Sequence, residues 1–172
     1  MGRKSVKENK NIYQLLREEA GLTREAAAEK MPWISSDRIE KIESGKSVPH
    51  SDEILPLSEC YKSPELPNYY CSHECPLGQK SVKEIRNGSL AEITLEMLAT
   101  LQSLTKDRDR LIEITYDGKV SDEQLPDFLK IMNELDNMAQ TISSLKLWMD
   151  KTLLEEKINR ELYNTLTNKT EQ

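Results

Sequence analysis

The chain has 172 residues and a net charge of −6, with 37% hydrophobic and 31% charged residues. So little apolar material cannot fill a large globular core, which favours small bundles and extended helices over a big α/β enzyme. No apolar run approaches the length of a membrane span, and the basic N-terminus lacks the apolar stretch of a signal peptide. We therefore expect a cytoplasmic protein with no membrane partner.

The negative charge is unevenly distributed along the chain. Residues 1–50 hold ten Lys or Arg against eight Asp or Glu, so the acidic surplus belongs to the remaining residues. Four basic residues crowd the N-terminus, where an arm would add contacts to phosphates: Arg3, Lys4, Lys7 and Lys10. Nucleic-acid binding is compatible with this composition, although the composition does not demand it.

The first fifty residues combine apolar helix patterns with strong stop signals. In residues 11–19 apolar positions recur three and four apart, which predicts a helix, and Gly21 suits the left-handed position after it. Thr23 is a good N-cap for a second helix that extends to Met31. Pro32 ends this helix, because proline disfavours the helical conformation at the residue before it.

A third helix follows closely. Ser35 or Ser36 can cap it, Ile39 and Ile42 share one face, and a glycine closes it. Ser51 is expected to cap a fourth short helix. Two short helices joined by a tight turn are typical of a helix-turn-helix unit, in which the later helix enters the major groove of DNA. An ordinary helical hairpin is the alternative.

Two stretches resemble the lambda-repressor-like, or XRE-type, DNA-binding domains: IYQLLREEAGLTREAAAEKM and RIEKIESGKSVP. The I-E-x-G-K-x-x-P run is the most specific part. The resemblance covers about residues 9–60 and implies a four- or five-helix fold that binds double-stranded DNA, commonly as a dimer, through its third helix. This chain departs from the family at Arg24, which replaces a glutamine that often touches the DNA backbone, and at Met31-Pro32-Trp33, which replaces the usual glycine of the turn.

The third helix and its surroundings supply the candidate DNA contacts. Lys and Arg donate to guanine and Ser can bind bases or phosphates, so the predicted reading surface comprises Ser35, Ser36, Asp37, Arg38 and Lys41. Arg24 and Lys46 are better placed for backbone phosphates, which position a protein without reading sequence. Asp37, Glu40 and Glu43 oppose the field of DNA, so a merely solvated charged face is the alternative.

Residues 60–80 differ in composition from the rest and hold all three cysteines. Three thiolates and one imidazole form a common zinc set, so the candidate metal ligands are Cys60, Cys71, His73 and Cys75. An iron–sulfur cluster is a second option, because the final Cys-Pro pair is typical of ferredoxin-type runs. The spacing of Cys71 and Cys75 is wider than that of the usual zinc knuckle, so a redox role and a structured linker with buried thiols remain alternatives. The family resemblance implies that a further ligand, near Pro67, has been lost.

From Ser81 onward the pattern becomes regular. Capping-box spacings occur at Ser81, Ser89 and Ser121, with Gly88 separating a short helix from a long one. After a turn at Asp117-Gly118, no proline or glycine interrupts residues 127–167, which permits one helix of about forty residues.

The two long helices predict an antiparallel hairpin or coiled coil with arms of unequal length. The side chains beyond the shorter arm would lack a partner: Leu153, Leu154, Ile158, Leu162 and Leu166. This overhang predicts a homodimer through the C-terminal helices, and the alternative is that it folds back on the rest of the chain.

Together these patterns predict an all-α protein: a helix-turn-helix DNA-binding domain in residues 1–59, an irregular Cys/Pro-rich linker in residues 60–80, and a helical hairpin in residues 81–172. The leading hypothesis is a sequence-specific, dimeric transcriptional regulator that acts as a repressor. The alternative is a protein-interaction adaptor that keeps this fold, no longer binds DNA and works through its coiled-coil tail. An enzyme is not expected, because the sequence has no glycine-rich phosphate loop, no H-E-x-x-H motif and no nucleophile elbow.

Overall fold

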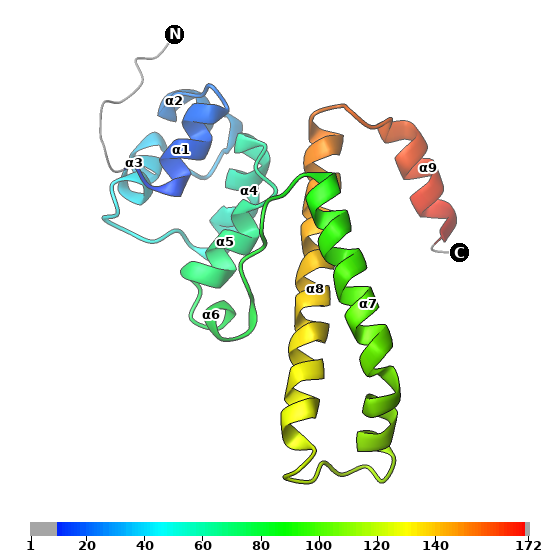
Figure 1. Cartoon of the computed structure of the whole chain (residues 1–172). Coiled ribbons are helices and arrows are strands. Elements are labelled where there is room, and N and C mark those ends of the chain that lie inside the picture. Colours follow the sequence, from blue (N-terminus) through cyan, green and yellow to red (C-terminus); the bar gives the residue numbers. More distant parts are fainter. Residues whose placement is uncertain (1–9, 171–172) are drawn as a thin grey trace. The chain divides into compact units, whose positions relative to one another are not determined.

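The computed structural model describes residues 10–170, in which every regular element is a helix, so the predicted all-α class is confirmed (Figure 1). The chain divides into two compact units, the first ending at Glu84 and the second beginning at Ile85. Within the described residues, no helix is both long and apolar enough to cross a membrane.

The first unit contains six helices: α1 Ile12–Glu19, α2 Arg24–Lys30, α3 Ser36–Glu43, α4 Ser51–Tyr61, α5 Leu66–His73 and α6 Gly78–Ser81. The predicted bounds of α1, α2 and α3 are confirmed to within a residue or two. Asn11, Thr23 and Ser35 are their N-caps, and each side chain accepts a hydrogen bond from the backbone amide three residues later. Gly21 follows α1 with a φ of 70°, as the stop signal predicts.

The core of this unit draws on α1 to α5. Its buried residues are Tyr13, Leu16, Ala27, Met31, Ile34, Ile39, Ile42, Ile54, Leu57, Tyr61 and Leu66. Ala27 is fully buried, and its small side chain lets α2 pack closely on its neighbours. Helices α2 and α3 therefore share one core with α1, which precedes them in the sequence, and with α4 and α5, which follow them.

Helix α4 begins differently from the prediction. His50, not Ser51, is its N-cap, and the His50 amide donates to a Glu53 carboxylate oxygen at 2.7 Å. The helix also continues through Pro56 to Tyr61, so it includes Cys60. Proline costs a backbone hydrogen bond inside a helix, but the buried Leu57 and Tyr61 beyond it offset this loss by packing into the core.

The prediction of an irregular linker in residues 60–80 is wrong. These residues complete α4 and form α5 and α6, and the first unit extends past them to Glu84. Leu66 is fully buried in the core, and Tyr69 and Tyr70 pack against it. The segment folds because its leucine and tyrosine side chains supply enough apolar surface to pack on the core. In the sequence analysis, its prolines and cysteines received more weight.

The second unit contains α7 Leu90–Thr115, α8 Leu125–Leu154 and α9 Arg160–Thr170. Helices α7 and α8 form the predicted antiparallel hairpin (Figure 1). The capping box of Ser89 and Glu92 opens α7, Gly118 takes a φ of 72° in the connecting loop, and Pro126 lies in the first turn of α8. The expected short helix after Ser81 is absent, because residues 82–89 are not helical.

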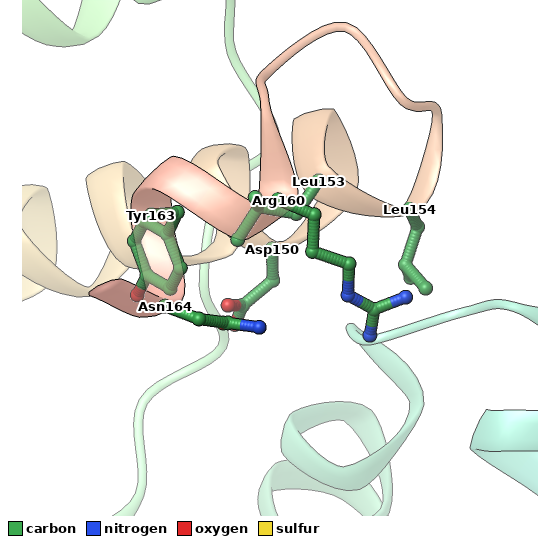
Figure 2. A pocket seen from close by; sticks show the side chains of 6 residues that line it. All are labelled: Asp150, Leu153, Leu154, Arg160, Tyr163 and Asn164. Carbon is green, nitrogen blue, oxygen red and sulfur yellow. The ribbon is translucent and has the colours of Figure 1, made fainter. Parts of the chain in front are cut away.

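The single helix of about forty residues that the sequence permits does not form, because α8 ends at Leu154. The Glu156 amide donates to Leu153 O, the Lys157 amide donates to Thr152 O, and Glu156 takes a φ of 56°. This is a Schellman ending, which usually has glycine at the left-handed position. After it, α9 begins a new direction, and an open pocket of about 270 Å³ at the junction is lined by Asp150, Leu153, Leu154, Arg160, Tyr163 and Asn164 (Figure 2).

Gly78 provides a test of how α6 packs on α5. A Cβ atom added to Gly78 would overlap the backbone carbonyl of Cys71. We expect Gly78→Ala to lower the free energy of unfolding by about 1–3 kcal/mol, because backbone atoms cannot move aside as a flexible side chain can. Urea denaturation followed by circular dichroism measures this change.

Gly88→Ala is the matched control, because a Cβ there meets only an ordinary contact at 3.4 Å from Ile93. Without the clash, alanine in place of Gly78 would stabilise α6 through its higher helix propensity. An unchanged or raised unfolding midpoint for Gly78→Ala would therefore contradict the close packing.

Candidate nucleic-acid interface

The turn between α2 and α3 is anchored by two apolar side chains. Met31 and Ile34 are 2% and 1% exposed, whereas Pro32 and Trp33 face solvent. Met31 has a φ of −124°, a conformation open to any residue, so this turn does not need the glycine usual in the resembled family. The Ile34 amide donates to Met31 O at 3.0 Å, which closes the turn before the N-cap of α3.

Helix α3 presents a polar face outward. Its buried side is formed by Ile39, Ile42 and Glu43. On the outside, the exposed and half-buried side chains are Ser36, Asp37, Glu40, Lys41 and Ser44. The structure thus brings together three members of the predicted reading surface, whereas the Ser35 hydroxyl accepts from the Arg38 amide at 3.2 Å and serves as the cap.

Arg38 is turned toward α4. Its guanidinium forms a bidentate pair with Glu53, with both N···O distances at 2.7 Å. It also donates to Ser47 Oγ at 2.7 Å and to Val48 O at 3.1 Å. The adjacent carboxylate raises the pKa of Arg38, and Arg38 lowers the pKa of Glu53. This side chain holds α3 to the start of α4, so a base contact would require it to give up these bonds.

Arg24 is also partnered within the domain. Its Nε lies 2.8 Å from a Glu43 oxygen, and Arg17 pairs with the same carboxylate at 2.5 and 2.9 Å. The Glu43 side chain is fully buried, whereas 36% of the Arg24 side chain is exposed. Arg24 can therefore present part of its guanidinium to a phosphate while Glu43 keeps it in place.

The remaining charges near α3 nearly balance. Lys41 is exposed, and Lys46 Nζ lies 3.3 Å from Glu40 in a solvent-exposed pair that contributes little stability. Lys10, the last residue of the basic N-terminal stretch, pairs with Glu18 at 2.7 Å. The predicted arm residues Arg3, Lys4 and Lys7 lie outside the described residues.

The four predicted metal ligands are not brought together. Within residues 10–170, no three His, Cys, Asp or Glu side chains are grouped so that they could hold a metal ion. Cys60 lies on α4 with its thiol toward Ala27 O at 3.9 Å, and burial raises its pKa, which disfavours the thiolate a metal needs. His73 instead stacks on Tyr69, with ring centroids 4.5 Å apart. A zinc or iron–sulfur site would require this segment to rearrange.

The cysteine-containing helix has a structural contact that the sequence analysis missed. The Tyr13 hydroxyl on α1 donates to Glu74 at 2.7 Å, and the Tyr13 and Tyr69 rings pack edge to face with centroids 6.4 Å apart. Burial, and then the Glu74 carboxylate, raise the pKa of Tyr13, so the phenol stays protonated as a donor. The only feature of the sequence that could have predicted this packing is the pair of tyrosines in α5, Tyr69 and Tyr70.

The Arg38–Glu53 pair predicts a pH-dependent stability. Because the folded pKa of Glu53 is lowered, its stabilising effect is complete above roughly pH 4.5 and is lost as the pH falls through the folded pKa. We expect Glu53→Gln to lower the free energy of unfolding by about 1–2 kcal/mol at neutral pH. The difference from wild type should shrink in acid, which urea titrations at several pH values measure.

Glu59→Gln, an exposed site on the same helix, makes the same chemical change and should leave stability nearly unaltered. Equal effects of the two substitutions at every pH would show that the Arg38–Glu53 pair does not stabilise the fold.

Comparison with known proteins agrees with this geometry. Residues 14–66 match a family model described as a helix-turn-helix domain. The match begins within α1, includes α2 to α4 and ends at the first residue of α5, and it covers less than half of the chain. Neither the search of curated proteins nor that of solved structures gave a match. The match supports a helix-turn-helix domain in residues 14–66 and, with it, a general role for the protein as a DNA-binding regulator.

Proposed function

We propose that this protein is a transcriptional regulator of the XRE type that binds a specific sequence in double-stranded DNA as a dimer and represses by occupying its site. The observation that carries this proposal is the match of α1 to α4 to a helix-turn-helix domain whose third helix has an exposed polar face. In such domains the later helix of the unit lies in the major groove, with its N-terminal residues at the base edges.

The side chains near α3 divide into reading and positioning roles. Ser36, Asp37 and Lys41 face outward, and together they offer a hydroxyl, an acceptor for cytosine N4 and a donor for guanine. Lys46 and the exposed part of Arg24 serve the phosphates. Arg38 supports the surface by fixing α3 relative to α4, rather than by touching a base.

The nearly balanced charge of the α3 surface is a reason to expect a dimer. Asp37 and Glu40 offset Lys41 and Lys46, so one domain gains little from phosphate attraction alone. Two linked domains on adjacent half-sites multiply their affinities, because the second domain binds at a high local concentration. The C-terminal unit is the part of the chain that supplies this link.

A second candidate function is supported by the same balance of charge. Two of the predicted DNA-contacting arginines, Arg24 and Arg38, are paired with carboxylates inside the domain. A protein-interaction adaptor would keep such structural pairs and dispense with a basic surface. The two functions differ in whether the full-length protein binds duplex DNA at low salt.

Selection from duplexes with a randomised central segment, using the full-length protein, tests the proposed function. We expect one enriched sequence with two similar half-sites, and an affinity that falls steeply with salt. Lys46→Ala should weaken binding to all sequences and reduce the slope of log affinity against log salt by about one, whereas Lys41→Ala should relax the preference at one base position.

Lys119→Ala, in the loop between α7 and α8, removes the same charge from the second unit and serves as the control. Enrichment of no sequence, together with no measurable duplex binding at low salt, would reject DNA regulation and leave the adaptor.

A further inference from the structure

We propose that one face of the α7–α8 hairpin binds the same face of a second copy of this chain. This inference rests on the dimer of the proposed function and identifies its surface. A hairpin of two helices can bury only the seam between them, so each helix keeps a second side exposed to solvent. The two sides of this hairpin differ sharply in chemistry.

One side is closed by polar contacts between the helices. Ser103 Oγ donates to Glu134 at 2.8 Å, and two ion pairs with N···O distances of 2.8 Å join Lys130 to Asp107 and Arg110 to Asp127. We call these six residues the polar edge. Because its members on α7 touch its members on α8, both sets lie on the same side of the hairpin.

The exposed apolar side chains of α7 lie on the other side of the seam. Successive residues of a helix are rotated by about 100° around its axis. Measured from the buried Ile93, which faces the seam, the polar-edge residues of α7 lie roughly 40–100° around the helix in one direction. In the opposite direction, roughly 60–140° from Ile93, lie four exposed apolar side chains: Leu90, Leu98, Leu101 and Ile112.

Helix α8 has the same arrangement. Counted from the buried Ile131, its polar-edge residues again fall to one side. To the other side, roughly 20–120° from Ile131, lie Leu125, Met132, Leu135 and Ile142. Since the polar edges of the two helices meet, these two apolar rows share the opposite face of the hairpin. We call the eight residues the apolar stripe.

The apolar stripe is suited to burial. Its eight side chains are 40–59% exposed. Thr94 and Thr105 lie among them, and their hydroxyls already donate to the carbonyls of Leu90 and Leu101 at 2.7 Å, so covering them leaves no donor unpaired. Arg108 lies in the α7 row between Leu101 and Ile112, and Lys146 lies just beyond the α8 row, where their long side chains can reach solvent. Asp136 borders the α8 row at roughly 140° from Ile131.

The area of the stripe fits a second copy of the chain. Eight large side chains, each about half exposed, offer on the order of 600 Å² per copy, so a pair would bury roughly 1,200 Å², the lower end of the range for stable interfaces. A self-complementary patch also satisfies a twofold axis, in which the same surface serves both partners. Two hairpins joined in this way form a four-helix bundle.

This surface differs from the overhang that the sequence predicts. The Schellman ending at Glu156 separates Leu153 and Leu154 from α9, so the overhang is not one continuous helical row. The apolar stripe lies instead along the paired lengths of α7 and α8.

Sedimentation of the full-length protein without DNA tests the proposal. We expect a wild-type mass of twice 19.8 kDa at micromolar concentration. The double variant Leu101→Asp/Leu135→Asp should sediment as a monomer, because each copy would bury two unpaired charges, and its dimer affinity should fall by roughly a hundredfold or more.

A matched control makes the same substitutions on the far side of each helix. Leu95 and Leu129 are exposed and lie about 160° around their helices from Ile93 and Ile131, outside the apolar stripe. Leu95→Asp/Leu129→Asp should remain a dimer. If circular dichroism shows that the stripe variant has lost helix, Leu101→Ala/Leu135→Ala replaces it and should weaken the dimer by roughly tenfold or more.

A monomeric wild type, or a stripe variant that dimerises as tightly as wild type, would overturn the proposal. Equal disruption by the control pair would also overturn it. Because no DNA is present, these results are independent of the duplex-binding test: a dimer that binds no DNA rejects the proposed regulator alone, and a monomer that still binds DNA rejects the stripe.

Discussion

The geometry of the helix-turn-helix depends most on the buried carboxylate of Glu43. Its side chain has no exposure, and it is held by Arg17 from α1 and by Arg24 from α2. An unpaired charge in this position would be very costly, so the three helices must keep the arrangement that pairs it. Arg17 further donates to Leu22 O at 2.6 Å, which ties the pair to the connection between α1 and α2. The orientation of α3 is thus set by one internal ion-pair cluster as well as by apolar packing.

This constraint changes how the acidic residues of the domain are understood. Glu43 and Glu53 add negative charge to the domain, which by itself disfavours DNA binding. Each carboxylate, however, forms an ion pair with an arginine inside the domain. The same pairing turns the Arg38 guanidinium toward α4. Net charge is therefore a poor guide here, because some acids and bases that cancel in the total, such as Glu43 with Arg17 and Glu53 with Arg38, are bonded to each other inside the domain.

Local signals in the sequence determine most of what could be predicted. N-cap side chains, stop glycines and apolar spacing act within one turn of helix, and they located α1, α2 and α3. What the sequence did not reveal are interactions that no local pattern encodes. Arg38 stays a predicted DNA contact, but its pairing with Glu53, fifteen residues away, could not be foreseen. The ending of α8 was missed because glutamate, not glycine, occupies the left-handed position at Glu156.

The cysteine segment illustrates the same limit in a different way. Cysteines with a nearby histidine suggest a metal, but the side chains that decide the fold of these residues are aromatic and aliphatic. Leu66 fills the core, and Tyr69 meets Tyr13 from the first helix of the domain. The segment consequently packs against α1 through Tyr69 and Glu74, which are far from Tyr13 in the sequence but in contact with it in the fold. Spacing rules for ligands cannot detect packing of this kind.

The two units solve the problem of limited apolar content in different ways. The first encloses a small core with five short helices, α1 to α5, and it also contains buried ion pairs such as Arg17–Glu43. The second has long helices and only a narrow seam, so much of its apolar surface stays outside. A DNA-binding surface with nearly balanced charge gains most from being doubled, and an exposed apolar face is lowest in free energy when it is covered. Pairing of the second unit would satisfy both requirements with one interface, if the protein binds DNA as proposed. This gives a physical reason for a helix α3 of nearly balanced charge and an incompletely buried hairpin to occur in the same chain.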